Sequence, residues 1–182
     1  MTKSLVCFSG GIDSLVALKI YMGMSECTAL MFYYGQPHAI ELDRAKEIAQ
    51  EMDVPYEVKS LTTLDRGEGV VFPARNLLFA AEAIAFACAN SFDNVVFGCN
   101  KSDWNNFPDC RPDFWNKLRD AAKSAYDVTL CTPLLHFTKQ EVVQTAKKLG
   151  LPLGKTWSCY TPDNGQQCGK CMACATRKSA GA

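Results

Sequence analysis

The chain has 182 residues, of which 48% are hydrophobic, and this suits a single domain over residues 1–182 with a substantial core. Its 19 basic and 19 acidic side chains cancel, and no block of like charge marks a surface for nucleic acid or an anionic membrane. Too few apolar residues follow the first three for a signal peptide, and no stretch is long enough to span a membrane. We therefore expect a cytoplasmic protein that binds small molecules.

Short β-type runs alternate with longer helical patterns along the chain. We predict strands at residues 5–8, 28–34, 55–61, 94–98 and 128–134, and helices at residues 14–24, 40–52, 76–90, 114–125 and 139–149. The last helix opens with Thr138 and Glu141, which have the spacing of a capping box. The alternation predicts an α/β fold, a parallel sheet with helices on both faces and ligands at the carboxyl ends of the strands.

The first strand is followed by the sequence SGGIDS, residues 9–14. Two glycines let backbone N–H groups approach a ligand, and the following helix directs its positive dipole end there, so the loop suits an anion. Ser9 and Ser14 add hydroxyl donors, and Asp13 could cap the helix or hold Mg²⁺. The loop lacks the lysine of a Walker A motif. The plainer interpretation is a tight turn with Asp13 or Ser14 as the N-cap.

Polar side chains also follow the second strand and open the third helix. Gln36 ends the second strand, where it could bind a ligand or only close a turn. Arg75 and Asn76 begin the helix, and the planar fork of an arginine suits a phosphate or a carboxylate.

The sequence NKSDWNNFPDCRPDF after the fourth strand is polar, aromatic and rich in turn formers, as expected of a binding loop. Asp103 and Asp109 are candidates to bind a ligand with two donor groups, and Arg111 is a candidate to neutralise an acid. The alternative is an ordered loop closed by an ion pair between Asp109 and Arg111.

Ten cysteines without a signal peptide favour reduced thiols or a metal site over disulfides. Six are scattered and expected in the core as free thiols, namely Cys7, Cys27, Cys88, Cys99, Cys110 and Cys131. The other four lie in residues 157–176, with the spacing C-x8-C-x2-C-x2-C, namely Cys159, Cys168, Cys171 and Cys174. This pattern predicts a closed, structural zinc site, with an iron–sulfur cluster or a redox disulfide set as alternatives.

The string SGGIDS resembles the SGGxDS signature of the PP-loop ATP pyrophosphatases, in which the loop holds the pyrophosphate of ATP and AMP is transferred to the substrate. Further strings are similar to the 7-cyano-7-deazaguanine synthase family over nearly the whole chain, namely FYYGQPH, FPARNLLF, GCNKSDWNNFPDCRPDF, TWSCY and CGKCMAC.

The resemblance implies a Rossmann-like homodimer with one structural zinc per subunit. It also implies conversion of 7-carboxy-7-deazaguanine, ammonia and ATP into the 7-cyano product. Because the acid needs a leaving group before ammonia can react, and the amide needs one to lose water, we expect two adenylations, through an acyl adenylate and an amide. The expected ATP-binding residues are Phe8, Ser9, Gly10, Gly11, Ile12, Asp13, Ser14, Leu15, Val16, Ala17 and Leu18. The expected catalytic residues are Ser9, Asp13, Arg75 and Arg111. The expected substrate-binding residues are Gln36, Arg75, Asn76, Asp103, Asp109 and Arg111.

Two features depart from that family. Pro37 stands where an arginine is common after the YGQ string, and the region between Ser60 and Phe72 is shorter than usual. Two alternative functions stay open, a PP-loop enzyme that acts on tRNA and a nucleotide-binding relative associated with defence. The first would need a basic face or an added domain, and the neutral chain has neither.

Overall fold

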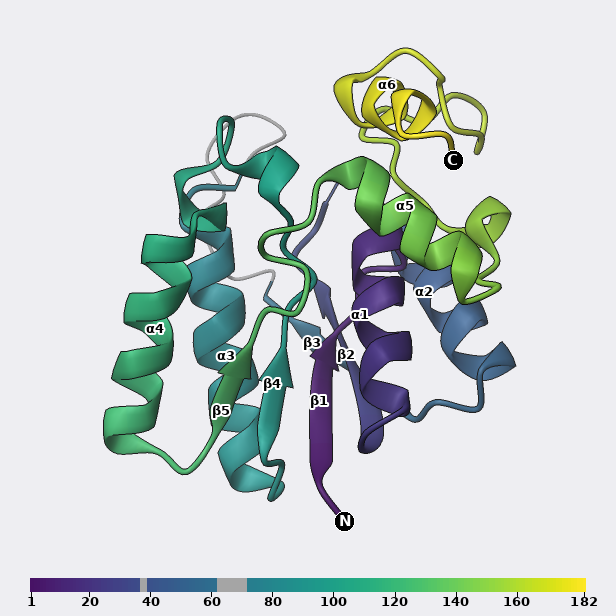
Figure 1. Ribbon diagram of the computed structural model, residues 1–182. Coiled ribbons are helices and arrows are strands. Elements are labelled where there is room, and N and C mark those ends of the chain that lie inside the picture. Colours follow the sequence, from purple (N-terminus) through teal and green to yellow (C-terminus); the bar gives the residue numbers. More distant parts are fainter. Residues whose placement is uncertain (37–38, 62–71) are drawn as a thin grey trace.

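The computed structural model describes residues 1–36, 39–61 and 72–182 (Figure 1). Pro37, His38 and most of the segment predicted to be short lie outside these residues. The strands are β1 (Lys3–Cys7), β2 (Glu26–Tyr33), β3 (Tyr56–Ser60), β4 (Asn94–Val96) and β5 (Thr129–Cys131). The α-helices are α1 (Ile12–Met22), α2 (Ile40–Glu51), α3 (Arg75–Ala89), α4 (Pro112–Ala125), α5 (Lys139–Lys148) and α6 (Met172–Ser179). Three short 3₁₀ turns are η1 (Lys101–Asp103), η2 (Pro108–Cys110) and η3 (Leu153–Lys155).

The five strands form one parallel sheet in the order β3-β2-β1-β4-β5, which confirms the predicted fold class. Helices α1, α2 and α5 cover one face of the sheet, and α3 and α4 cover the other (Figure 1). The chain reverses its direction of travel across the sheet between β1 and β4. Ligands of open α/β sheets bind at such a point, outside the carboxyl ends of the strands.

Each face of the sheet carries its own apolar core, because neighbouring residues of a strand point to opposite faces. In β1, Val6 belongs to the cluster under α1, α2 and α5, and Leu5 belongs to the cluster under α3 and α4. Both side chains are fully buried. The near-continuous apolar runs that predicted the strands reflect this burial on both sides.

The structure corrects some of the expected details. Helix α1 begins at Ile12 with Gly11 as its N-cap, so neither Asp13 nor Ser14 caps it. Cys88 is exposed, whereas we expected it in the core. It lies on the outer side of α3, since Ala83, Ile84 and Ala87 face the sheet.

Other details are confirmed or were missed. The capping box of Thr138 and Glu141 forms as predicted. Helix α6 was not predicted, and it lies with the C-terminal residues above the carboxyl ends of the strands (Figure 1). Within the described ranges, no helix has both the length and the apolar character that crossing a membrane requires.

Candidate active site and cysteine cluster

The loop between β1 and α1 is a compact turn held by its two serines. The Ser14 hydroxyl donates to the Gly11 carbonyl at 3.0 Å and accepts from the Ser9 backbone N–H at 3.2 Å. Gly10 adopts a left-handed φ of +78°, and a Cβ there would lie 3.0 Å from backbone atoms of α2. Glycine is therefore required for both its conformation and its size.

A second close approach brings the end of β4 to the start of α1. A Cβ on Gly98 would lie 2.8 Å from the Asp13 carbonyl carbon and from the Ser14 nitrogen. The first turn of α1, with its free N–H groups, therefore lies directly at the point where the sheet order reverses. This is the geometry of an anion-binding site.

A cavity of about 310 Å³ opens beside this loop. Of the expected ATP-binding residues it is lined by Phe8, Ser9, Gly11, Ile12, Asp13 and Ser14. The remaining ones do not line it, and Leu15, Val16, Ala17 and Leu18 are fully buried in the core between α1 and the sheet. Residues 8–14, except Gly10, thus line the cavity, and residues 15–18 pack in the core.

An ion pair that the sequence did not predict lies at the mouth of the loop. Lys139, the first residue of α5, places its Nζ atom 2.5 Å from Oδ2 of Asp13, and both side chains are largely buried. The other oxygen of Asp13, Oδ1, is buried and has no hydrogen-bond partner among the described residues. The pair offers one cation for a phosphate and one free carboxylate oxygen for Mg²⁺.

Gln36 lines the cavity, but its amide group is engaged by the chain. Its Oε1 accepts from the Tyr34 backbone N–H at 2.9 Å, and its Nε2 donates to the Phe32 carbonyl at 3.2 Å. Nε2 also lies 3.4 Å from Oε1 of Glu41. These bonds close the end of β2, which favours the turn interpretation of Gln36.

Arg75 and Glu41 carry the charge of this side of the cavity. Arg75 donates to the Tyr34 hydroxyl at 3.5 Å, and its guanidinium lies 5.9 Å from the Phe79 ring centre. Burial raises the pKa of Glu41 to about 7, against the opposing effects of the Arg75 charge and the Gln36 hydrogen bond. Glu41 therefore changes its charge close to neutral pH.

The loop after β4 contributes some of its candidates to the cavity but not all. Asp103 lines it and accepts from the Asn100 amide at 3.0 Å, and burial together with the Asp13 charge raises the pKa of Asp103. Asn76 also lines it and donates to the Asp109 carbonyl at 3.3 Å. Arg111 lies outside the cavity lining.

Asp109 likewise lies outside the lining. Arg111 is exposed, and its Nε donates to the Trp104 carbonyl at 2.8 Å. No ion pair joins it to Asp109 in the part of the chain that the structure describes. The loop is therefore closed by backbone contacts in place of the ion pair that the alternative interpretation required.

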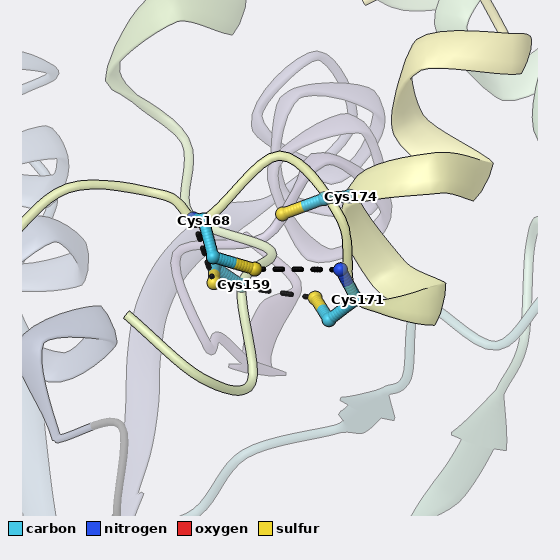
Figure 2. Close-up of side chains that lie close together, drawn as sticks. All are labelled: Cys159, Cys168, Cys171 and Cys174. Carbon is cyan, nitrogen blue, oxygen red and sulfur yellow. Dashed lines mark hydrogen bonds between the residues drawn. The ribbon is translucent and has the colours of Figure 1, made fainter. Parts of the chain in front are cut away.

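The four C-terminal cysteines converge on one point, as Figure 2 shows. Their Sγ atoms all lie within 4.8 Å of one another, and those of Cys159 and Cys171 are 4.0 Å apart. Four sulfurs at about 2.3 Å from a zinc ion would be slightly closer together than this. Soft sulfur ligands in a tetrahedral set suit zinc or an iron–sulfur cluster, so the residues fit a metal centre.

Backbone N–H groups donate to two of these four sulfurs. The N–H of Cys168 points to Sγ of Cys159, and the N–H of Cys171 points to Sγ of Cys168, each at 3.3 Å (Figure 2). Bonds from the Thr161 hydroxyl and from the N–H groups of Lys170 and Cys171 lower the pKa of Cys168 to about 6. The lowered pKa of Cys168 favours its thiolate, the form that binds metals.

The segment that carries the cysteines also forms a wall of the cavity. The backbone N–H of Trp157 donates to the Gly10 carbonyl at 3.0 Å, and Tyr160 and Thr176 line the cavity. The sequence predicted the cysteine cluster but not this wall, Lys139 or Glu41. Lys139 directly follows a predicted N-cap at the ligand edge of the sheet, and that position was the available signal.

Comparisons with known proteins agree with this architecture. A family model described as "Queuosine biosynthesis protein QueC" matches residues 3–70 and 66–181. The 7-cyano-7-deazaguanine synthase of Leptospira interrogans is 32% identical over 207 aligned residues, which cover 97% of this chain and 85% of the relative. The protein of the same name from Acinetobacter baylyi is 35% identical over 203 residues, covering 97% and 89%. Both aligned stretches exceed 182 residues, so the relatives carry residues that this chain lacks.

Two solved structures share the fold. One is the U34-tRNA thiolase NcsA of Methanococcus maripaludis with its [4Fe-4S] cluster, with a TM-score of 0.65 and 19% identity over 98% of this chain. This chain spans 63% of the length of that protein. The other is the NH3-dependent NAD synthetase of Campylobacter jejuni, with a TM-score of 0.55 and 18% identity over 85% of this chain and 66% of that one. At these identities the likeness concerns the fold alone.

Proposed function

The chain belongs to the family of the queuosine biosynthesis protein QueC, and on this premise we propose that it converts 7-carboxy-7-deazaguanine and ammonia into 7-cyano-7-deazaguanine at the expense of ATP. Support comes from relatives of that name over nearly the whole chain. The observation that carries the proposal is the Ser9–Ser14 loop, which lies at the sheet reversal with Lys139 and Asp13 at its mouth.

The reaction must first give the acid a leaving group, because a carboxylate does not react with ammonia at neutral pH. In the proposed first step the acid oxygen attacks the α-phosphorus of ATP, and the electron pair of the broken P–O bond leaves with pyrophosphate. The first N–H groups of α1 and the Lys139 ammonium lie where they can neutralise the departing charge. Asp13, through Oδ1, would help to hold Mg²⁺.

Ammonia then displaces AMP from the acyl adenylate and gives the amide. Removal of water from an amide needs a second leaving group, and adenylation of the amide oxygen supplies it. In that adenylation the amide oxygen attacks the α-phosphorus of a second ATP, pyrophosphate leaves, and the nitrogen loses one proton. Departure of AMP with loss of the second nitrogen proton then leaves the nitrile. One site would thus act twice, and its residues position and neutralise the reactants instead of attacking them.

For the substrate, we propose that Arg75 holds the 7-carboxylate and that Asp103 accepts hydrogen bonds from the amidine-like edge of the ring. Both line the cavity, and a planar guanidinium matches a carboxylate. Asp109 and Arg111 remain candidates for substrate binding, although they would have to move to reach the cavity. Asn76 and Gln36 support this side through their bonds to the chain.

We further propose that the cysteine cluster holds one structural zinc ion per chain and that the protein is a cytoplasmic homodimer, as in the family that the sequence resembles. Zinc would be bound by Cys159, Cys168, Cys171 and Cys174, and it would stabilise the segment that covers the cavity. No reaction step involves this ion.

The function is tested by incubating the protein with 7-carboxy-7-deazaguanine, ATP, Mg²⁺ and an ammonium salt, with products read by mass spectrometry and chromatography. We expect two AMP and two pyrophosphate for each nitrile, accumulation of the amide when ATP is limiting, and conversion of the added amide without ammonia. ADP as the main product, or an amide that the protein cannot convert, would contradict the two adenylations. No conversion of the acid at all would refute the function.

A further inference from the structure

An amide that is almost completely buried lies next to the cavity in the loop after β4. Asn100 is 1% exposed and directly precedes η1. Among the described residues, Asp103 lines the cavity and Asn100 does not. A buried amide needs partners for its acceptor and its donor, because an unpaired polar group away from water costs free energy. Asn100 has both partners within the same turn.

The backbone of η1 determines which way this amide points. Oδ1 of Asn100 accepts from the Ser102 backbone N–H at 2.9 Å, and this bond caps the turn. Since a backbone N–H can only donate, the oxygen of the amide must face Ser102, and its NH₂ group faces the other way. Nδ2 of Asn100 donates to Oδ2 of Asp103 at 3.0 Å. The cap of the turn therefore directs a donor to the carboxylate at the cavity.

The bond from Asn100 restrains the plane of the Asp103 carboxylate. The torsion that rotates a carboxylate about its last carbon–carbon bond has broad preferences, so a partner is needed to fix it. In the part of the chain that the structure describes, Asn100 makes the only hydrogen bond to this carboxylate. Each carboxylate oxygen can accept more than one bond, so both oxygens can still accept from a ligand. Two parallel N–H donors fit a carboxylate only when the planes match.

From this geometry we propose that Asn100 is a positioning residue that sets the plane of the Asp103 carboxylate and so makes the site selective for a ring with two adjacent N–H donors. The inference rests on the proposed function, in which Asp103 binds the amidine-like edge of the 7-deazaguanine. Asn100 does not touch the substrate and acts through Asp103. A ring without the exocyclic amino group loses one of the two bonds, so an aligned carboxylate discriminates against it.

The same bond also influences the charge of Asp103. Burial and the Asp13 charge raise the pKa of Asp103, whereas the Lys139 and Arg75 charges and the Asn100 hydrogen bond lower it. The other titratable groups that act on this site are Cys99, Cys110 and Tyr160. Loss of the Asn100 donor should therefore raise the pKa of Asp103. Substrate binding, which needs the carboxylate, should then be lost at a higher pH as the solution is acidified.

The test compares Asn100→Ser with Asn105→Ser, which makes the same change at an exposed residue of the same loop outside the cavity lining. The shorter side chain at position 100 can still cap η1, but it cannot reach Asp103. We compare kcat/KM for 7-carboxy-7-deazaguanine and for its analogue without the exocyclic amino group. The ratio of the two values should fall about 10-fold in Asn100→Ser, the size expected for one hydrogen bond to a charged group. It should stay at the wild-type value in Asn105→Ser.

Two further measurements separate positioning from a disordered turn. In Asn100→Ser the acid limb of kcat/KM for the substrate should move to a higher pH. Ser102 Oγ accepts from the Lys139 backbone N–H at 2.9 Å, so disorder of η1 would also disturb Lys139 at the proposed ATP site. Binding of α,β-methylene-ATP with Mg²⁺ should therefore stay close to the wild-type value if only the carboxylate is misaligned.

A double variant tests whether Asn100 acts through Asp103. Asp103→Asn should reduce the discrimination by itself, and Asn100→Ser should reduce it no further in that background. Additive losses, wild-type discrimination in Asn100→Ser, an unmoved acid limb, or an equal loss of nucleotide binding would each overturn the inference. If thermal unfolding shows that Asn100→Ser does not fold, Asn100→Thr, which keeps a cap and fills more of the site, takes its place.

The outcomes also separate this inference from the proposed function. If the wild type does not convert the acid, the proposed function fails and this inference fails with it. If the wild type makes the nitrile and Asn100→Ser discriminates between the two rings equally well, the inference alone is wrong.

Discussion

The parallel sheet and the cysteine segment, residues 157–176, each form a wall of one cavity, but different interactions stabilise them. The sheet lies between two large apolar clusters with many fully buried side chains. In the cysteine segment the buried apolar cluster consists of Trp157, Cys159 and Cys174. Because so small a cluster offers little to offset the entropy of ordering about twenty residues, we expect this wall to depend on a metal bound by its four thiols.

Because the apolar clusters of the two walls are separate, we expect that the cavity can lose one wall without losing the other. The sheet positions the loop of residues 9–14 through backbone contacts, whereas the cysteine segment reaches that loop through the hydrogen bond from the Trp157 backbone N–H to the Gly10 carbonyl. We therefore expect changes in the cysteine segment to unfold that segment and abolish turnover while the sheet stays folded. Changes in the loop of residues 9–14 should abolish turnover with the whole fold intact.

The largest effect is expected for Cys171→Ser. Loss of one thiolate from the set of four should release the metal, lower the stability of the segment by several kcal/mol and abolish turnover, because a structural site contributes folding energy. Metal analysis should find about one zinc per wild-type chain and none in the variant. Trypsin should cleave the variant in the segment while the sheet keeps its far-UV circular dichroism.

The matched control is Cys88→Ser, which removes an exposed thiol on α3 and should keep both metal and activity. Visible charge-transfer absorption together with stoichiometric iron in the wild type would show an iron–sulfur cluster at this site and would contradict the assignment of zinc. A Cys171→Ser protein with full metal content and turnover would show that the segment is held without the metal.

The next effect concerns the loop of residues 9–14 on the sheet side, which we propose binds ATP. Lys139→Met should lower turnover about 10²- to 10³-fold, the typical loss when one preorganised group that stabilises developing charge is removed. Asp13→Ala and Ser9→Ala should abolish turnover with the fold intact. Steady-state kinetics and thermal unfolding of the same preparations separate a loss of turnover from a loss of stability.

Lys147→Met is the control for this loop, since Lys147 lies on the exposed side of the same helix. Turnover at the wild-type level in Lys139→Met, or in Ser9→Ala, would remove the assignment of this loop to ATP.

A smaller effect should come from the contact between β4 and α1. An alanine at Gly98 would place its Cβ 2.8 Å from backbone atoms that cannot move independently. Overpacking of this kind costs about 1 to 3 kcal/mol, and the displaced first turn of α1 should also weaken ATP binding. Denaturant unfolding and nucleotide titration measure the two losses.

Gly154→Ala tests the same substitution next to the cysteine segment. A Cβ there meets nothing within 4 Å, so we expect little change in stability or in nucleotide binding. Equal losses in the two glycine variants would mean that the close approach at Gly98 does not position the loop.

The sequence predicted the sheet side better than the other wall, for a physical reason. Strands and helices leave a periodic pattern, and the parallel order follows from their alternation, so each described strand was anticipated. Local chemistry identified the thiols of the cysteine cluster, because tight spacing alone brings them together. The boundary of α1 was missed by two residues, since an extended Gly11 caps a helix without a side-chain signal.

What the sequence could not predict are contacts between distant segments. Lys139 and Asp13 are 126 residues apart and meet only because α5 returns to the face covered by α1. The environment of Glu41 depends on Arg75 and Tyr160, which come from separate elements. Cys88 was misplaced for a similar reason, because composition does not tell which side of an alanine-rich helix faces the sheet.

The smallest effect is expected for an ion pair away from the cavity, which joins α2 to the stretch just before the cysteine segment. Lys155, in η3, lies 2.6 Å from the Glu51 carboxylate at the end of α2, and both side chains are about half exposed. Exposed pairs contribute about 0 to 1 kcal/mol and are screened by salt, so Lys155→Met should change unfolding by no more than this and should leave turnover unchanged. Arg177 joins the same stretch to α6 through bonds to Thr156, and it should matter more than Lys155. Denaturant unfolding at low and high salt measures the free energy of unfolding of both variants. A salt-sensitive loss of activity in Lys155→Met would contradict this expectation. It would show that surface charge holds the cysteine segment in place, and not the metal and the bond from Trp157 to Gly10.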